Sequence, residues 1–483
     1  MGDLKSLAKD TVIYGVSSIL GKFLNYLLTP LYTIYMVSDT GDYGVLTNIY
    51  SIVAMMLVIL TFGMETGFFR FANKEGYDAR KVYSASIQVV LFLAGLFLLL
   101  SLVFIDGLSS VLGYADNPQY LYMMFIVVAL DAFQALPFSY LRYKKKALKF
   151  AALKMLFIVL SITLNVVYFV FMGGRDVGVV FLINLICTAV VTIALYAEIR
   201  EFSFKLDIAL IKQLISYSWP MLILGIAGML NQVADKILFP HIYPDPATKD
   251  IQLGIYGASS KVAMVMAMFT QAFRFAYEPI VFGKSRDKNN KTVYAQAMKY
   301  FIIFSLLAFL AVVLYIDILK YIIGQTYWEG LVVVPIIMIA ELFMGIYFNL
   351  SFWYKLTDKT IWGAVFSVTA CIVVIVLNII FVPKYGYIAC AWASLIGYGI
   401  AMCLSYVVGQ RYYPINYDIK SIAIYGLSAL TIYLIASLVE FENTFIRLSF
   451  NTILLLGYVS LVVRRDLPLR KIPIINKLVK RKQ

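Results

Sequence analysis

The chain is a succession of long apolar runs separated by short polar segments. An apolar run crosses about 30 Å of hydrocarbon when it is about 20 residues long. Several runs are longer than that, so we expect tilted helices or helices that end in the interface. The pattern predicts an all-α polytopic membrane protein with fourteen transmembrane helices, at residues 11–37, 43–69, 82–105, 118–141, 148–172, 177–199, 213–240, 252–282, 292–318, 330–354, 360–382, 386–409, 419–439 and 444–463.

Composition supports this reading. Hydrophobic residues make up 62% of the chain and charged residues 14%, whereas an ordinary soluble domain is about 25% charged. The mean hydropathy is +0.84. The first apolar run is longer than the core of a signal peptide, so we expect its helix to be retained. All loops are short, so the function must be carried by the helices.

The positive charges predict the orientation. With a cytoplasmic N-terminus, thirty lysines and arginines fall in cytoplasmic segments and five in outer segments. This asymmetry follows the positive-inside rule and places both termini in the cytoplasm. The formal net charge of +14 is then mainly a topology signal, with contact to anionic lipid headgroups as a second role. We expect membrane lipids, and no nucleic acid, as partners.

The helices divide into two groups of six and a final pair. An even number of helices per half starts both halves on the same side, which is typical of a parallel repeat. The boundaries predict an N-terminal lobe at 1–204, a C-terminal lobe at 205–412, and two further helices with a basic tail at 413–483.

A lysine in the first apolar run suggests a cavity. Lys22 lies eleven residues into the run, about 16 Å deep at helical rise. Asn25 and Thr29 follow it on the same helical face. A charge at this depth is costly unless it faces water or a partner. We expect Lys22 to line a cavity, with a structural ion pair as the alternative.

The eighth apolar run carries two more cations. Lys261 is deep and becomes the second candidate for the cavity. Arg274 lies thirteen residues later, about 220° around an ideal helix. Glu278, four residues further on, offers Arg274 a structural partner. A structural pair and a cavity gate both stay open for Arg274.

The other three cations within the spans lie near helix ends. We expect Lys154 and Lys299 to snorkel to the cytoplasmic interface, because each lies within about two turns of it. Lys236 is expected to reach the outer interface and to point away from its neighbour Asp235, since successive helical residues are about 100° apart.

Buried acids divide into candidates for ion coupling and structural acids. Asp131, Asp235 and Glu341 are the candidates for carrying a coupling proton or sodium ion, and paired acids that lock helices together are the alternative. Glu65 lies close to Arg70 in sequence, so we expect a structural pair there.

No sequence pattern indicates a cofactor, a metal or a catalytic centre. The four cysteines lie in apolar runs without a CxxC spacing, and there is one histidine. We expect neither a disulfide nor a metal site, and a transporter rather than an enzyme.

Three segments carry a family resemblance: GKFLNYLLTPLYTIYM, DYGVLTNIYSI and FGMETGFFRF. Together with the layout of six, six and two helices, they resemble the polysaccharide-biosynthesis flippases (Wzx-like) of the multidrug/oligosaccharidyl-lipid/polysaccharide exporter superfamily. The resemblance implies two six-helix lobes forming a V, and outward movement of an undecaprenyl-diphosphate-linked oligosaccharide by alternating access in the bacterial cytoplasmic membrane. It makes the polysaccharide polymerase machinery a candidate partner.

The resemblance also implies roles for particular residues. In the related lipid II flippases, cations on the first and eighth helices line the cavity. Lys22 and Lys261 fall on these helices, and Arg274 does so if its face permits. Lysine offers point-charge attraction to a diphosphate where arginine would clamp it with two bonds. The remaining polar candidates, expected to meet sugar hydroxyls, are Asn25, Asn231 and Gln232.

Two other functions fit parts of the sequence. A drug or metabolite cation antiporter of the same superfamily needs an acid in its N-terminal lobe, and Asp131 is available. A membrane glycosyltransferase or polysaccharide polymerase would use Asp39 and Asp42 in the first outer loop, but such enzymes usually have a sizeable outer domain, which this pattern lacks.

Overall fold

A computed structural model describes residues 26–36, 41–283, 290–357, 359–439 and 441–466. Lys22 and Asn25 lie outside these ranges, as does most of the first predicted span, of which residues 26–35 are described and helical. No strand occurs in the described ranges, and thirteen of their helices are long and apolar enough to cross a membrane. This confirms the predicted all-α membrane fold.

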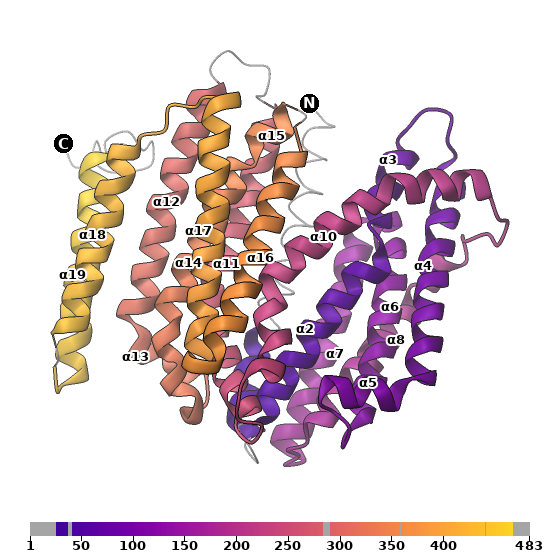
Figure 1. The fold of residues 1–483 in the computed structure, drawn as a ribbon, viewed down its shortest axis with the longest axis horizontal. Coiled ribbons are helices and arrows are strands. Elements are labelled where there is room, and N and C mark those ends of the chain that lie inside the picture. Colours follow the sequence, from indigo (N-terminus) through magenta and orange to yellow (C-terminus); the bar gives the residue numbers. More distant parts are fainter. Residues whose placement is uncertain (1–25, 37–40, 284–289, 358, 440, 467–483) are drawn as a thin grey trace, which may run out of the picture. The chain divides into compact units, whose positions relative to one another are not determined.

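The helix bounds follow the apolar runs closely (Figure 1). The main helices are α2 (Gly41–Thr61), α3 (Met64–Ala72), α4 (Ala79–Val103), α6 (Pro118–Tyr143), α7 (Ala147–Val166), α8 (Val177–Ala194), α10 (Ile208–Ile242), α11 (Lys249–Gly283), α12 (Asn290–Leu314), α14 (Val334–Leu350), α16 (Ile361–Tyr385), α17 (Tyr387–Tyr412), α18 (Ile419–Leu438) and α19 (Thr444–Arg465).

Short helices complete these spans or cap their ends. They are α5 (Ile105–Leu112), η1 (Val167–Phe171), α9 (Tyr196–Ile199), α13 (Ile316–Leu319), η2 (Lys320–Ile322), η3 (Gln325–Val333) and α15 (Phe352–Leu356).

The second predicted span is broken between α2 and α3. Phe62 and Gly63 both have positive φ, at 50° and 67°, which interrupts the helical hydrogen bonding. The backbone carbonyl of Ser218 lies directly beside Gly63, so a side chain at this position would meet α10. The break lets α3 change direction and pack against α10 and α4.

The chain divides into two compact units. The first comprises Met1–Ser259, Ile323–Gly330 and Ala364–Gly397, and the second comprises Ser260–Ile322, Leu331–Gly363 and Tyr398–Gln483. The division passes through α11 between Ser259 and Ser260. The lobe boundaries at 204/205 and 412/413 stay predictions drawn from the sequence repeat.

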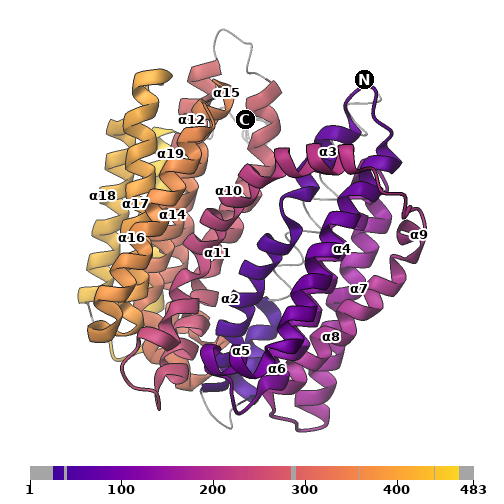
Figure 2. The same cartoon turned by 45° about the vertical axis from the view of Figure 1, so that its right-hand side comes forward.

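In the first unit, α6 is the central helix. It packs against α2, α4 and α8, and α7 packs on α8. α2 also runs along α10, so the unit joins a helix from each half of the sequence (Figures 1 and 2).

In the second unit, α12 is the central helix. It packs against α14, α18 and α19, so the C-terminal pair of helices is attached mainly through α12 (Figure 1). A buried cluster of Tyr277, Val281, Tyr294, Phe352 and Ile415 anchors the segment between α17 and α18.

Candidate functional site

Glycines bring α2 against α11 at one end of the first unit. A side chain at Gly44 would collide with the backbone of Asp250 on α11, and one at Gly257 would collide with Thr47 on α2. Because glycine has no β-carbon, the two helices approach more closely than other residues would allow.

Hydrogen bonds fasten the same end of the unit. The Thr33 hydroxyl accepts from the Gly324 N–H at 3.0 Å. Asn48 on α2 donates to the Lys236 carbonyl on α10 at 2.7 Å and accepts from the Tyr114 hydroxyl at 2.8 Å. We refer to these contacts, together with the two glycine contacts, as the α2–α10 joint.

Asp235 is buried in the joint and holds two partners. Its carboxylate lies 3.1 Å from the Lys236 ammonium and accepts from the Tyr256 hydroxyl at 2.6 Å. The expectation that Lys236 points away from Asp235 is therefore wrong. Helical spacing separates the two β-carbons, but the four-carbon lysine stem curls back to a carboxylate that has little access to water.

Asn231 and Gln232, predicted to meet sugar hydroxyls, have different surroundings. The Asn231 amide is buried and donates to the Ser367 carbonyl on α16 at 2.9 Å, so in this conformation it joins two helices. Gln232 is exposed. Of the two, Gln232 is the one available to a ligand here.

The cations of α11 lie in the second unit. Lys261 and Arg274 are both half-buried. The guanidinium carbon of Arg274 lies 4.3 Å from the centroid of the Phe348 ring on α14. Stacking on an aromatic face favours arginine over lysine and fixes the plane of the guanidinium. Glu341, also half-buried, is on the same helix as Phe348. The side chain of Glu278 lies outside the described structure.

Lys154 does not behave as predicted. It is half-buried on α7, its ammonium lies 4.0 Å from the centroid of the Phe138 ring, and the carboxylates of Asp131 and Glu65 attract it. The expectation of snorkelling is wrong because two acids and an aromatic face inside the unit compete with the interface for the ammonium. The sequence did contain a signal for this position of Lys154, namely two buried acids in the same half of the chain.

Glu65 and Arg70 do not form the expected pair. Glu65 accepts from the Ser139 hydroxyl at 3.0 Å, and the Arg70 guanidinium lies 4.3 Å from the centroid of the Tyr217 ring. Five residues along a helix correspond to about 140°, so the two side chains leave α3 in different directions.

Lys299, also expected to snorkel, is ion-paired. Its ammonium lies 2.6 Å from Asp466 and 3.5 Å from Asp418. The pairing ties α12 to the ends of α18 and α19. Both acids come from segments far away in sequence, so helix position alone did not reveal them.

A second set of polar contacts holds the segment before α10. The Glu201 carboxylate binds the Lys144 ammonium at 2.5 Å and the Tyr140 hydroxyl at 2.6 Å. These two partners lower the pKa of Glu201 below its usual range. Lys149 binds the buried Glu198 at 2.7 Å. We refer to the contacts of Glu198 and Glu201 as the linker clamp.

The structure gathers only some of the predicted residues. Asn231 and Asp235 lie together on α10 in the first unit, and Asp131 lies on α6 of that unit. Lys261, Arg274 and Glu341 lie in the second unit. Within the described ranges, no group of three or more histidine, cysteine or acidic side chains is placed to hold a metal ion.

Comparisons with known proteins decide the family. The family model for polysaccharide biosynthesis proteins matches residues 7–277, which is more than half of the chain. The chain belongs to this family. A search of curated proteins found no match.

Solved structures show which fold this family member adopts. The lipid II flippase MurJ in an inward closed conformation matches with a TM-score of 0.75 and 16% identity, over 94% of this chain and 99% of that chain. An inward-facing multidrug resistance MATE family transporter of the MOP superfamily matches with a TM-score of 0.66 and 13% identity, over 80% of this chain and 93% of that chain. The MATE multidrug transporter DinF-BH matches with a TM-score of 0.63 and 18% identity, over 84% of this chain and 96% of that chain. This member of the polysaccharide biosynthesis family therefore has the exporter fold.

Proposed function

We propose that this protein is a flippase that moves an undecaprenyl-diphosphate-linked oligosaccharide from the cytoplasmic to the outer leaflet of a bacterial membrane by alternating access. The observation that carries the proposal is the family match, together with the MurJ fold over nearly the whole chain. The cargo would be a repeat unit of a polysaccharide or O-antigen. The polysaccharide polymerase machinery is the partner expected downstream.

The cargo presents a clear physical problem. A diphosphate and several sugars cannot cross hydrocarbon without a polar path, because the cost of burying an unpaired charge is prohibitive. Lys22 and Lys261 would compensate the diphosphate charge, and Arg274 joins them if its Phe348-stacked guanidinium faces the cavity. Gln232 and Asn25 would meet sugar hydroxyls. Asn231 would do so only after leaving Ser367.

The α2–α10 joint supports a gate at the outer face. Its residues come from helix ends that the positive-inside rule places outside, and its close contacts join the two halves of the sequence. We propose that the joint closes the outer side while cargo enters from the cytoplasm. Opening would separate Asn48 from the Lys236 carbonyl. It would also expose the neighbouring Asp235, which is then available for a coupling proton or sodium ion.

The membrane potential can drive the export. Each negative charge that leaves a negative interior gains about 2.3 kcal/mol per 100 mV. Two phosphate charges gain about twice that if the cavity cations stay behind. Coupling through Asp235, Glu341 or Asp131 would add to this driving force and is not required by it.

The principal alternative is a drug or metabolite cation antiporter. The likeness to multidrug transporters favours it, and Asp131 is the acid it would use. In this structure, however, the charge of the Lys154 ammonium acts on both Asp131 and Glu65. A resident cation opposes binding of a second one, so the flippase is the better reading. Sugar transfer by purified membranes would instead reveal the glycosyltransferase or polymerase.

The test is complementation in a strain that lacks the gene. We expect the deletion to leave lipid-linked repeat units on the cytoplasmic face, where a membrane-impermeant glycan probe added outside cannot reach them. Lys22→Ala and Lys261→Ala should insert in the membrane but fail to restore export. Lys81→Ala removes an exposed lysine at the start of α4 and serves as the matched control, with export expected to be normal.

Normal export by the Lys22→Ala/Lys261→Ala double variant would refute the cavity assignment. Normal surface glycan in the deletion strain, combined with increased sensitivity to cationic drugs, would refute the flippase and favour the antiporter.

A further inference from the structure

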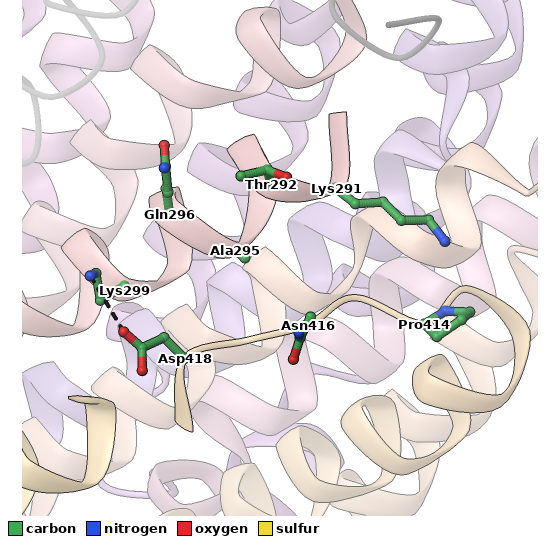
Figure 3. Close-up of a pocket in the computed structure, with 8 residues that line it drawn as sticks. All are labelled: Lys291, Thr292, Ala295, Gln296, Lys299, Pro414, Asn416 and Asp418. Carbon is green, nitrogen blue, oxygen red and sulfur yellow. Dashed lines mark hydrogen bonds and ion pairs between the residues drawn. The ribbon is translucent and has the colours of Figure 1, made fainter. Parts of the chain in front are cut away.

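A pocket opens at one end of the second unit, between the first turns of α12 and the segment that joins α17 to α18 (Figure 3). Its volume is about 450 Å³, within the range of sites for small molecules. It is lined by Lys291, Thr292, Ala295, Gln296, Lys299, Pro414, Asn416 and Asp418.

The rim of the pocket is held in place by its own contacts. The Tyr413 hydroxyl donates to the Asn290 side chain at 3.3 Å, and the Gln410 amide donates to the Ile415 carbonyl at 2.8 Å. Ile415 is buried in the aromatic cluster of this unit. Asp418 caps α18 by accepting from the Ser421 N–H at 3.1 Å. The pocket is therefore preformed, which lowers the entropy cost of binding.

The charges favour an anion at the Lys291 end of the pocket. Lys299 is paired with two acids, Asp418 at 3.5 Å and Asp466 at 2.6 Å, so its own charge is fully used. Lys291 has no ion pair with any described carboxylate; its ammonium lies 4.5 Å from the centroid of the Tyr413 ring. Figure 3 shows it at the opposite end of the pocket from the Lys299–Asp418 pair. The N-terminal end of α12 adds positive potential beside it.

Asp418 lies beside Lys299, at the other end of the pocket from Lys291 (Figure 3). Hydrogen bonds from Ser421, and then the charge of Lys299, hold the pKa of Asp418 below its usual range. Asp418 therefore stays ionised and paired with Lys299 at neutral pH. The hydroxyl of Thr292 and the amides of Gln296 and Asn416 leave the centre of the pocket polar, as a phosphate and its alcohol substituent require.

The surroundings distinguish a lipid from a soluble phosphate. The pocket lies at the helix ends that the positive-inside rule places at the cytoplasmic surface. Beyond the pocket, α18 packs on α12. α18 also exposes apolar side chains along its length, at Ile419, Leu427, Leu430 and Leu434. Ile419, the first of these, directly follows the pocket residue Asp418, so the apolar surface of α18 begins beside the pocket. Basic pockets between transmembrane helices on the cytoplasmic side are typical sites for anionic headgroups.

We propose that this pocket binds the phosphate headgroup of an anionic glycerophospholipid, with Lys291 as its principal cation. The lipid would be a resident ligand at the junction of α12 and α18, separate from the transported cargo. The site does not depend on the flippase assignment, because it rests on contacts within the second unit and on the predicted sidedness.

The test uses the full-length protein in vesicles of equal parts phosphatidylglycerol and phosphatidylcholine, followed by native mass spectrometry of the lipids that remain bound. We expect preferential retention of phosphatidylglycerol. Lys291→Gln should lower that retention about fivefold, the size expected for one lysine near an anionic surface. Gln296→Trp should lower it as well, because the indole fills the pocket while every charge remains.

The matched control is Lys359→Gln. Lys359 is an exposed lysine of the same unit whose ammonium lies 3.7 Å from the centroid of the Tyr412 ring, and it is not part of the pocket. Its substitution should leave retention unchanged. Lys291→Arg keeps the charge and should restore binding, which separates loss of the site from loss of folding.

Three results would overturn the proposal. Equal loss in Lys291→Gln and Lys359→Gln would show a general surface effect. Unchanged retention in Lys291→Gln and Gln296→Trp would place the lipid elsewhere. Displacement of the lipid by millimolar glycerol phosphate, with binding of that compound to lipid-free protein, would make the site one for a soluble phosphate.

Discussion

The α2–α10 joint and the linker clamp both connect different parts of the sequence within the first unit, but they do so by different physics. The joint depends on close backbone approach at Gly44 and Gly257 and on buried hydrogen bonds. The clamp depends on charged side chains, of which Glu201 and Lys144 are each about one third exposed. Close packing tolerates almost no added volume, whereas exposed ion pairs contribute little stability each. Added volume should therefore disturb the joint more than the loss of one charge disturbs the clamp.

The largest effect is expected from Gly44→Val. Its β-carbon would overlap the Asp250 backbone, and the branched side chain has little freedom to avoid it. We expect a destabilisation of the closed joint of about 3 kcal/mol, which corresponds to more than about a hundredfold change in its population. Export should be lost although the protein is inserted. The loss of export is measured by complementation of the deletion strain with the Gly44→Val variant.

Gly228→Ala is the control for the previous substitution. Gly228 is on α10 with open space around it, so a methyl group should be accommodated and export retained. If Gly44→Val exported as well as Gly228→Ala, close approach at the joint would have no functional importance.

Asp235→Asn is expected to have the next largest effect. It removes the charge partner of Lys236 in a buried setting, which costs about 3 kcal/mol in comparable pairs. The melting temperature of the purified protein should fall by several degrees. The Asp235→Leu/Lys236→Met variant should regain most of that stability, because no unpaired charge remains. A double variant as unstable as Asp235→Asn would show that the ion pair is not the cause.

Asn48→Ala should cost less, about 1 to 2 kcal/mol, because it leaves the Lys236 carbonyl and the Tyr114 hydroxyl without this partner. Asn73→Ala is the matched control, since that side chain makes one exposed bond to the Phe69 carbonyl. Thermal unfolding of both variants gives the comparison. Equal melting temperatures would place the strength of the joint in its glycine contacts alone.

The smallest effect is expected from Glu201→Gln in the clamp, less than about 1 kcal/mol, because the pair with Lys144 is partly exposed. The pKa of Glu201 is lowered in the folded protein by Lys144 and Tyr140. Its contribution is therefore present above the unfolded pKa of about 4.3 and is lost as the pH falls through the lower folded value.

The pH dependence gives the measurement for this variant. The difference in melting temperature between the original protein and Glu201→Gln should be largest near neutral pH and should shrink below about pH 4.3. A difference that grew on acidification would contradict the lowered pKa.

Particular residues show how far sequence reasoning reached. The apolar runs predicted the bounds of thirteen described spans, because the need to satisfy backbone hydrogen bonds in lipid leaves helices as the solution. The same reasoning did not predict the contacts of Lys154, Lys299 and Lys236, which were all assigned to an interface. Lys236 binds an acid one residue away, Lys299 binds one 167 residues away, and Lys154 lies over the Phe138 ring. Helical periodicity predicts the direction in which a side chain leaves its helix, but it does not predict which residue of another helix the side chain contacts.

The sequence by itself determined the membrane class, the spans, the predicted orientation and the family segments, since these depend on local hydropathy, on charge in short loops and on residue patterns within one stretch. The tertiary structure alone decided that Asp235 binds Tyr256 and Lys236, that Arg274 stacks on Phe348, and that Gly44 adjoins Asp250. These contacts join different helices or depend on a flexible stem, and close packing fixes them only when the whole chain has folded.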